Sequence, residues 1–323
     1  MSGSGPRVSL GMPVYNAQRY LAQALDSILA QTFRDFELVI SDNGSTDRTE
    51  EICRQYVARE QPRIRYHRNE INRGAAWNHN HVFTLSRGDY FKWVAYDDWC
   101  APEFLEKCVA VLDRAPDAAL CYTGIVDVDE EGKPLRLNPC LAGRYARPYE
   151  RFRIIVDHKH SCEEVYGLIR SSILKKTPLM GSYAASDQNL LAELALRGTF
   201  HEVPEVLFFH RVHPQSSCLL YGDRRLRTVW FDSSARGRLL FPLVRQFWEY
   251  LALLWRVPLP WYERLRCHGL MLRWLKQYGR AMARDTFWGA YWGVREWIIV
   301  SIKAYMPWVR TVYRALSNPQ ERS

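Results

Sequence analysis

The sequence lacks the cysteine pattern of a secreted protein held together by disulfides. No CxxC pair is present, and several of the eight cysteines lie in apolar stretches, where a reduced cysteine behaves as a small hydrophobic side chain. We therefore expect free thiols in a reducing, cytoplasmic compartment. The cysteines are Cys53, Cys100, Cys108, Cys121, Cys140, Cys162, Cys218 and Cys267.

Apolar segments long enough for export or membrane crossing are also missing. The first residues, MSGSGPRVSL, contain no hydrophobic signal-peptide region, so we expect no secretory signal. No window reaches about 18 uninterrupted apolar residues, the length that a membrane span requires. The longest apolar stretch, residues 297–309, is interrupted by Lys303 and Pro307, which is more typical of a segment lying on a membrane.

Common nucleotide and zinc motifs are absent as well. No GxGxxG follows the first expected strand, and no GK[ST] follows the turn NGST at 43–46, which argues against a dinucleotide-binding Rossmann domain and a P-loop. The histidine-rich segments HNH (79–81) and HKH (158–160) have no cysteine at ligand spacing, so a structural zinc site is disfavoured.

Positive charge is concentrated at one end of the chain. Residues 224–323 contain 18 Lys and Arg against 6 Asp and Glu, a net +12, so the remaining residues contain 26 against 29, a net −3. The same segment holds nine of the twelve tryptophans. With 47% hydrophobic residues and no low-complexity tract, the whole chain is predicted to fold.

The first hundred residues alternate strand and helix patterns. Expected strands at 8–12, 36–41, 64–67 and 90–95 are separated by expected helices at 20–31, 49–60 and 74–85. This order predicts a mostly parallel α/β sheet with helices on both faces. Polar loops follow each strand, at 13–16, 41–47, 69–78 and 95–98, and ligands bind at that edge of such sheets.

The remaining chain is less regular. We expect a helix at 102–114, a strand at 118–129, irregular structure over 134–162, a strand at 165–170, a helix at 187–198 and a strand at 206–213. Aromatic and basic helices are expected from about residue 222. We therefore expect one domain over 1–221, with halves 1–115 and 116–221, followed by a helical C-terminal region over 222–323.

Asp97 and Asp98 form the most informative pair of polar residues. Adjacent aspartates after a strand often serve only turn formation and helix capping. Two carboxylates at a strand end also suit Mg²⁺ or Mn²⁺, which prefers oxygen ligands and shares its coordination with substrate phosphates. The three other polar loops at the same edge favour this second interpretation.

Three segments, 8–49, 72–78 and 95–105, together resemble the inverting family 2 glycosyltransferases with the GT-A fold. The similarity keeps order and spacing from residue 8 to about 214. It implies a nucleotide-sugar-binding half over 1–115 and an acceptor half over 116–221. In the donor half, it implies that the nucleotide is contacted by Pro13, Tyr15, Asn16, Asp42 and Arg73.

The resemblance also implies the catalytic and metal-binding residues. Asp97 and Asp98 match the end of the family's metal motif, although Ala95 stands where many relatives have its first aspartate. His213 matches a histidine that helps to hold the metal and the diphosphate, and Arg211 is a candidate phosphate partner.

Asp187 matches the general base at the start of the family's "ED" helix, whose other acid is Ser186 here. The alternative is that Ser186 and Asp187 only begin a helix, where an acidic first turn is favoured.

The expected activity is a metal-dependent, inverting sugar transfer from a nucleotide-diphosphate sugar to a hydroxyl of a glycan or lipid-linked acceptor. Manganese or magnesium is the expected cofactor. A sugar-1-phosphate nucleotidylyltransferase would need a GxGTR-like loop where this chain has GMPVYN. A catalytically inactive binding scaffold is the alternative, since Ala95 and Ser186 replace two expected acids.

Two interpretations of the basic, Trp-rich region stay open. Its helices could pack on the domain with solvated Arg faces, or they could lie on an anionic membrane, with Trp rings at headgroup depth. The second places the protein peripherally on the inner face of the cell membrane. Nucleic-acid binding is not expected, because the Trp and aliphatic content fits lipid better.

Overall fold

The computed structural model describes residues 5–138, 141, 145–157, 162–236, 238 and 240–305, with only the backbone described for 217, 218, 289 and 292–305. In this part of the chain a nine-stranded sheet has the order β3-β2-β1-β4-β8-β6-β9-β5, and β7 pairs with β6. The strands are β1 (Val8–Val14), β2 (Phe36–Asp42), β3 (Ile64–Arg68), β4 (Tyr90–Trp93), β5 (Trp99–Cys100), β6 (Ala118–Val128), β7 (Pro134–Asn138), β8 (Leu168–Arg170) and β9 (Thr199–Arg211).

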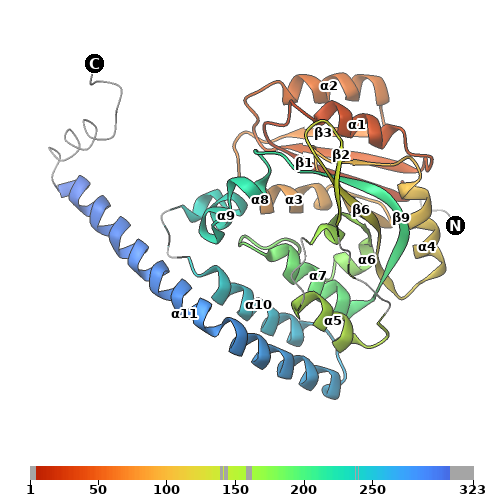
Figure 1. The fold of residues 1–323 in the computed structure, drawn as a ribbon. Helices are drawn as coiled ribbons and strands as arrows, with labels where there is room; N and C mark the ends of the chain where they lie inside the picture. The colour runs from red at the N-terminus through yellow and green to blue at the C-terminus, as the bar shows by residue number, and fades with distance from the viewer. Residues whose placement is uncertain are drawn as a thin grey trace.

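Helices lie on both faces of this sheet, as predicted, and a longer pair follows at the C-terminal end (Figure 1). The α-helices are α1 (Leu21–Leu29), α2 (Thr49–Glu60), α3 (Ala75–Thr84), α4 (Phe104–Arg114), α5 (Pro148–Asp157), α6 (Ser171–Leu174), α7 (Ser186–Arg197), α8 (Ser217–Leu220), α9 (Arg224–Phe231), α10 (Pro242–Arg256) and α11 (Trp261–Tyr305); two 3₁₀ turns are η1 (Glu163–Tyr166) and η2 (Ser233–Ala235).

The donor half has the predicted alternation. Strands β1 to β4 run parallel, and Val14 at the end of β1 is in register with Asp42 at the end of β2. Helix α1 forms because Leu21, Ala24 and Leu25 recur at helical spacing and bury one face against the sheet. The polar loops that follow these strands consequently meet at one edge.

The prediction of irregular structure over 134–162 was wrong for two segments, which form β7 and α5. Strand β7 is a short, largely exposed edge strand, and its alternation of Leu135 and Leu137 around Arg136 is too brief to predict a strand. Helix α5 does bury Phe152, Ile155 and Val156 at helical spacing, but charged residues between them conceal the pattern.

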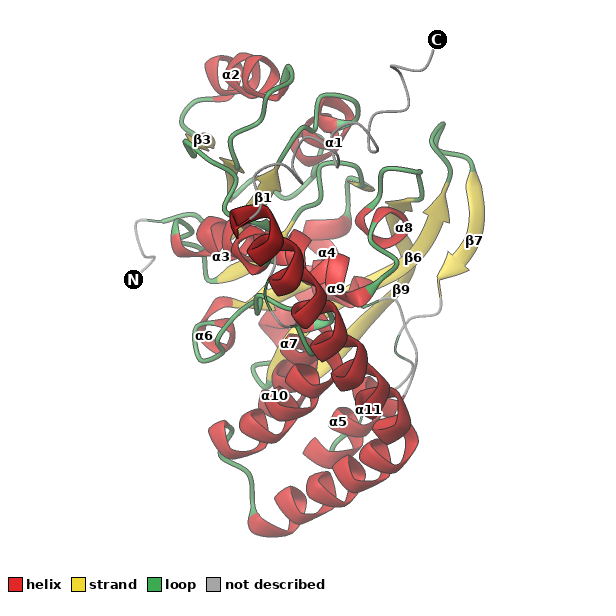
Figure 2. Ribbon diagram, turned by 90° about the vertical axis from the view of Figure 1, so that its left-hand side faces the viewer, coloured by secondary structure: helices red, strands yellow, loops and turns green. Residues whose placement is uncertain are grey.

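The C-terminal helices share a hydrophobic core with the acceptor half. One cluster of buried side chains contains Phe152 of α5, Leu190 of α7, Tyr250 of α10 and Trp274 of α11. Figure 2 shows α11 running beside α5 and α10. Residue 221 therefore does not separate two cores, and the chain as far as Trp274 is built into the domain.

Six cysteines fall in the described part of the chain, and all are buried free thiols, in agreement with the sequence: Cys53, Cys100, Cys108, Cys121, Cys162 and Cys267. Among the helices of the same residues, none combines the length and apolarity that crossing a bilayer requires.

We expect Trp274→Ala to lower the free energy of unfolding by about 3–5 kcal/mol, the usual loss for a truncated buried aromatic side chain. Its ring packs against Phe247 and Tyr278, with centroids 5.6 and 4.7 Å away. Urea unfolding of the full chain measures this loss. The exposed Trp261→Ala is the control and should change stability by less than about 0.5 kcal/mol. If the C-terminal helices unfolded in a separate transition at lower urea concentration, that result would contradict a shared core.

Candidate functional site

The loops after β1 and β2 are tied together by side-chain hydrogen bonds. The Asn16 backbone N–H donates to Ser45 Oγ (2.9 Å), and Asn16 Oδ1 accepts from the Thr46 N–H (2.9 Å). Asn16 adopts a φ of 51°, in the left-handed region that asparagine tolerates. Asn16 thus shapes the predicted nucleotide loop from within.

Asp42 lies beneath the same loops. Its Oδ1 accepts from the Ser45 N–H (2.8 Å) and its Oδ2 from the Tyr66 hydroxyl (2.7 Å). The residue has no exposed surface. These contacts make Asp42 an organiser of the loop, and its predicted contact with a nucleotide base stays a prediction.

The other predicted donor residues lie closer to solvent. Pro13 lines the cleft described below, and Tyr15 is exposed. Arg73 is also exposed, and its guanidinium carbon lies 4.7 Å from the centre of the Trp77 ring. The backbone N–H of Arg73 donates to Asn43 Oδ1 (3.1 Å), which anchors the loop before α3 to the loop after β2.

Asp97 and His213 are brought together from the ends of two segments. Asp97 Oδ2 lies 3.0 Å from His213 Nε2. The histidine is 2% exposed and its Nδ1 is buried without a hydrogen-bond partner in the described residues. Asp97 is more accessible, with 18% of its side chain exposed, and lines the cleft. Both residues are among the three metal ligands that the resemblance implies.

Asp98 takes a different role from its neighbour. Its Oδ1 accepts from the backbone N–H of Arg211 (2.8 Å), so the carboxylate anchors the end of β9. Burial, followed by the charge of Asp97, raises the pKa of Asp98 to about 7. The prediction that Asp97, Asp98 and His213 hold a metal together stays a prediction, with Asp98 Oδ1 already bonded to the backbone of β9. No group of three metal-ligating side chains is assembled within the described residues.

The prediction that Arg211 contacts phosphate stays a prediction; its guanidinium already makes three hydrogen bonds to protein groups. It donates to the Asp97 carbonyl (2.9 Å), to Gln23 Oε1 (2.5 Å) and to the Glu130 carbonyl. The guanidinium carbon also lies 4.4 and 4.8 Å from the ring centres of Tyr20 and Trp99. Arg211 is a structural clamp.

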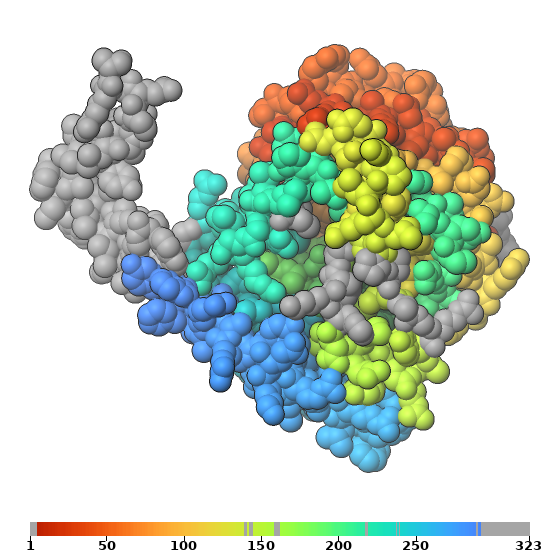
Figure 3. Space-filling view, viewed as in Figure 1, coloured from red at the N-terminus to blue at the C-terminus, as the bar shows by residue number. Residues whose placement is uncertain are grey.

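A cleft of about 1120 Å³, partly open to solvent, contains the acidic residues of the site. Asp97 and Asp98 meet Asp187, Glu163 and His210 there. Figure 3 shows the surface hollowed beside α8 and α9. The sequence analysis predicted that Asp187 joins the two aspartates, and the structure places all three on this cleft.

Asp187 stands in the first turn of α7. Its Oδ1 accepts from the Gln188 N–H (2.8 Å), and the preceding Ala185 has a φ of 70°, a strained value for a residue with a side chain. This turn brings the start of α7 to the cleft. The helix-capping alternative and the catalytic one are thus compatible, because a carboxylate in the first turn of a helix can face a cleft as well.

Glu163 and His210 are site residues that the sequence analysis missed. His210 Nδ1 lies 2.9 Å from Asp127 Oδ1, and its Nε2 lies 3.8 Å from Glu163 Oε1. Burial lowers the pKa of His210, but the carboxylates of Asp98, Glu163 and Asp127 outweigh it and raise the pKa to about 9. Burial raises the pKa of Glu163 to about 8. The sequence did contain one sign of this charged cluster: the segment VDVD at 126–129, which puts an acidic face on an expected strand.

Helix α9 closes the cleft from the C-terminal side with Arg227, Trp230 and Phe231. It rests on Gly74, where a Cβ atom would lie 2.5 Å from the Phe231 carbonyl oxygen. Gly74 has a φ of 90°, which only glycine adopts readily. The sequence analysis assigned α9 to a separate region and so missed its contribution.

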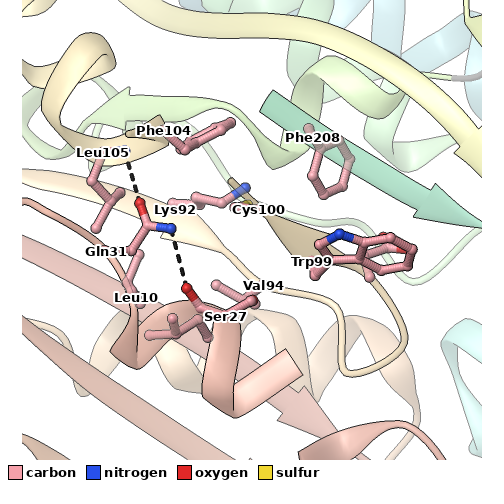
Figure 4. Close-up of a pocket in the computed structure, with 12 residues that line it drawn as sticks. Leu10, Ser27, Gln31, Lys92, Val94, Trp99, Cys100, Phe104, Leu105 and Phe208 are labelled. Carbon is pink, nitrogen blue, oxygen red and sulfur yellow. Dashed lines mark hydrogen bonds between the residues drawn. The ribbon is translucent and has the colours of Figure 1, made fainter. Parts of the chain in front are cut away.

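A small apolar cavity lies behind Asp98 (Figure 4). Lys92 is buried there, and its ammonium lies 4.4 and 4.8 Å from the ring centres of Phe104 and Phe208. It donates to the Tyr166 carbonyl, while burial lowers its pKa. The cavity is too apolar for donor binding, and Lys92 serves as a buried cation behind the acidic cleft.

The two histidine-rich segments have different outcomes. In HNH, His79 Nδ1 lies 2.9 Å from the Ala75 carbonyl and His81 stacks on Trp77 with ring centres 4.4 Å apart. Each of the two imidazole rings therefore has a contact within the protein. The segment HKH (158–160) lies outside the described residues.

The arrangement of sheet and cleft defines the class of protein, a glycosyltransferase-type α/β fold of the GT-A kind. S. aureus TarS 1-349, solved in complex with UDP, superposes with a TM-score of 0.56 at 18% sequence identity, over 87% of this chain and 89% of that one. The model of glycosyl transferase family 2 matches residues 9–177, more than half of the chain. The chain belongs to this family.

Two relatives match about two fifths of the chain in sequence. Putative glycosyltransferase EpsE of Bacillus subtilis (strain 168) is 39% identical over 129 residues, which are 40% of this chain and 46% of EpsE. Chondroitin synthase of Escherichia coli is 34% identical over 127 residues, 39% of this chain and 18% of that protein. The chain therefore spans less than half the length of either relative.

We expect Asp127→Asn to lower the pKa of His210 from about 9 towards its ordinary value near 6.5, because a charge-assisted hydrogen bond is lost. Since the folded-state pKa is raised, the imidazolium stabilises the fold fully below about pH 6.5, and that contribution disappears as the pH rises through 9.

An NMR titration of the His210 ring measures this shift. Asp129→Asn is the control, because Asp129 lies in the turn after β6 and is bonded to the backbone of Glu131 and Lys133. An unchanged His210 pKa in Asp127→Asn would show that the ion pair is not formed.

Proposed function

We propose that the chain is a metal-dependent, inverting glycosyltransferase of the hexosyltransferase type. It moves a sugar from a nucleotide-diphosphate sugar to a hydroxyl of a glycan or lipid-linked acceptor, in the synthesis of cell-surface polysaccharide or glycolipid. The observation that carries the proposal is the convergence of Asp97, which pairs with His213, and Asp187 on one cleft at the carboxyl edge of a parallel sheet. Family membership supports the transferase class.

The related proteins support the substrate classes. TarS, which shares the fold, was solved with UDP and with UDP-GlcNAc, so a fold of this kind accommodates a nucleotide sugar. A chondroitin synthase among the sequence relatives supports polysaccharide synthesis. The donor would enter over Pro13, Tyr15 and Arg73, and the acceptor would approach from α9.

The Asp97–His213 pair suits a divalent cation. Magnesium and manganese are commonly held by one or two protein ligands together with substrate phosphates, and Asp97 offers an accessible carboxylate. The buried, unpartnered Nδ1 of His213 is a polar atom left over in the described residues, as expected beside an ion or phosphate. When bound, Mn²⁺ or Mg²⁺ would supply charge neutralisation for a departing diphosphate.

Asp187 is proposed as the general base. Its carboxylate would accept the proton of the acceptor hydroxyl while that oxygen bonds to the anomeric carbon. The bond from that carbon to the diphosphate oxygen breaks on the opposite face, so the configuration inverts. Glu163 and His210 line the same cleft and can orient acceptor hydroxyl groups through hydrogen bonds.

We propose Arg227, in addition to the predicted Arg211, as an arginine that contacts the diphosphate. It lines the cleft from α9, where its Nε donates to the Tyr221 carbonyl (3.1 Å). An arginine fork matches phosphate geometry, and Arg227 faces the cleft, so it suits a diphosphate bound there.

We expect Asp187→Asn to reduce sugar transfer by about 10²–10⁴-fold, the usual contribution of a general base, with nucleotide binding preserved. A panel of nucleotide sugars assayed with Mn²⁺ and Mg²⁺ identifies the donor, and calorimetry measures nucleoside-diphosphate binding. Chelation by EDTA should abolish transfer.

Asp35→Asn is the control for Asp187→Asn, because Asp35 is an exposed aspartate far along the chain from the cleft residues. Full activity of Asp187→Asn would overturn the assignment of the base. Absence of donor binding and hydrolysis across the panel would instead favour a scaffold without catalysis.

We expect Arg227→Gln to weaken nucleoside-diphosphate binding by about ten-fold or more, the worth of a charge-assisted hydrogen bond, while thermal stability is retained. Arg211→Gln should in addition lower the melting temperature, because its buried partners lose their donor. Calorimetry and thermal unfolding on both variants measure the contrast. Equal binding by wild type and Arg227→Gln would remove Arg227 from the donor site.

A further inference from the structure

The solvent side of the C-terminal helices is unusually apolar. Trp248 and Trp255 of α10 and Trp261 of α11 are between 62% and 75% exposed. Exposed apolar patches of this kind mark interaction surfaces. We call this surface the aromatic face and define it by Trp248, Trp255, Trp261, Leu265, Leu272 and Phe287.

Helix α11 has two apolar sides. Its inner side buries Cys267, Leu270 and Trp274 in the core. Its outer side carries Leu265 and Leu272, seven residues apart and therefore on one helical stripe. The inner side accounts for the packing of the helix, so the outer apolar stripe needs a partner outside the domain.

The two helices form one continuous surface. The ring of Trp255 on α10 lies 5.7 Å from the ring of His268 on α11, and the guanidinium carbon of Arg264 lies 5.1 Å from the Trp255 ring centre. Trp255 therefore bridges the outward sides of α10 and α11. Figure 2 shows α11 lying lengthwise at this side of the molecule.

Basic residues border the aromatic face. Arg266, Arg273 and Arg280 recur at seven-residue intervals beside the apolar stripe, and Lys276 and Arg284 are exposed among them. In contrast, no described acidic residue of α10 or α11 is exposed; these acids are Glu249, Glu263 and Asp285. The exposed charge on this face is thus of one sign.

We propose that the aromatic face docks on a bilayer containing anionic lipid. Exposed Trp rings are suited to the headgroup region, and Arg and Lys beside them are attracted to negative lipid headgroups. A second copy of the chain fits less well, because it would bring the same cations, such as Lys276 and Arg280, against each other. The aromatic face lies within the C-terminal region 222–323 for which the sequence analysis left membrane binding open.

A groove beside this face supports a lipid partner. It is lined by Trp248 and Phe241 on the α10 side and by Leu179 and Tyr183 on the other, and Tyr183 precedes Asp187 by four residues. If the proposed function holds, an acceptor anchored in the bilayer would approach the catalytic base along this side. Docking itself requires no transfer activity and is tested without donor or acceptor.

Vesicle flotation of the full chain tests the proposal. Vesicles of phosphatidylcholine with phosphatidylglycerol should retain the protein, and vesicles of phosphatidylcholine alone should retain little. Lys276→Glu, Arg280→Glu and Arg284→Glu together should lower the partition coefficient by about 100-fold or more, since each cation strengthens binding to an anionic surface about five-fold. Within the described residues these three side chains form no ion pair, so the fold should tolerate the change.

A matched control separates a docking face from net charge. Arg48→Glu, just before α2, with Arg54→Glu and Arg59→Glu on α2, changes the net charge equally at the opposite end of the molecule (Figure 1). Retention of this variant should stay within a few-fold of wild type. An equal loss in both triple variants would overturn the proposal, because only the net charge would matter.

A second pair of variants tests the aromatic contribution. Trp255→Ser with Trp261→Ser should also release the protein from anionic vesicles, whereas Leu135→Ser with Leu137→Ser, exposed on β7, should not. Circular dichroism confirms folding of each variant. Unchanged retention of the Trp variant would overturn the proposal. The proposal would also be overturned if wild type were not retained on vesicles and instead sedimented as a dimer that the Trp variant dissociates.

Discussion

The buried guanidinium of Arg211 is the contact on which the candidate site depends. It joins the end of β9 to the loop after β4 through the Asp97 carbonyl and to α1 through Gln23, while Tyr20 and Trp99 cover its two faces. Asp98 completes the junction by accepting the Arg211 N–H. With this junction fixed, Asp97 and His213 have little freedom to move apart, so the positions of a carboxylate and an imidazole are set before any ligand arrives.

The fold was predictable where contacts are close in sequence. Strands β1 to β4 follow one another through single helices, and periodicity located each one. The acceptor half depends on the pairing of β6 with β9, in which Ala118 is in register with Thr199, and no local pattern reports such a distant partner. Helix α5 and the core around Trp274 were missed for the same reason, because burial by a remote helix decides their environment.

The sequence predicted which residues belong to the candidate site better than it predicted what each of them does there. The resemblance found Asp97, His213 and Asp187, which share one cleft or contact each other. It could not tell which of two adjacent aspartates points outward, since Asp98 turns inward only because the end of β9 presents an unpaired N–H. Asp127, Glu163 and His210 come from three separate segments, and only the folded chain reveals them as a charged cluster.

The seating of α9 on Gly74 has a consequence for protein engineering. Because a loop of the donor half supports the helix that closes the cleft, the two halves cannot be exchanged as independent modules. A chimera that grafts the C-terminal helices of a relative onto this chain would need to carry the complementary start of α3 with it. Evolutionary change in acceptor preference should accordingly leave correlated substitutions on both sides of this junction.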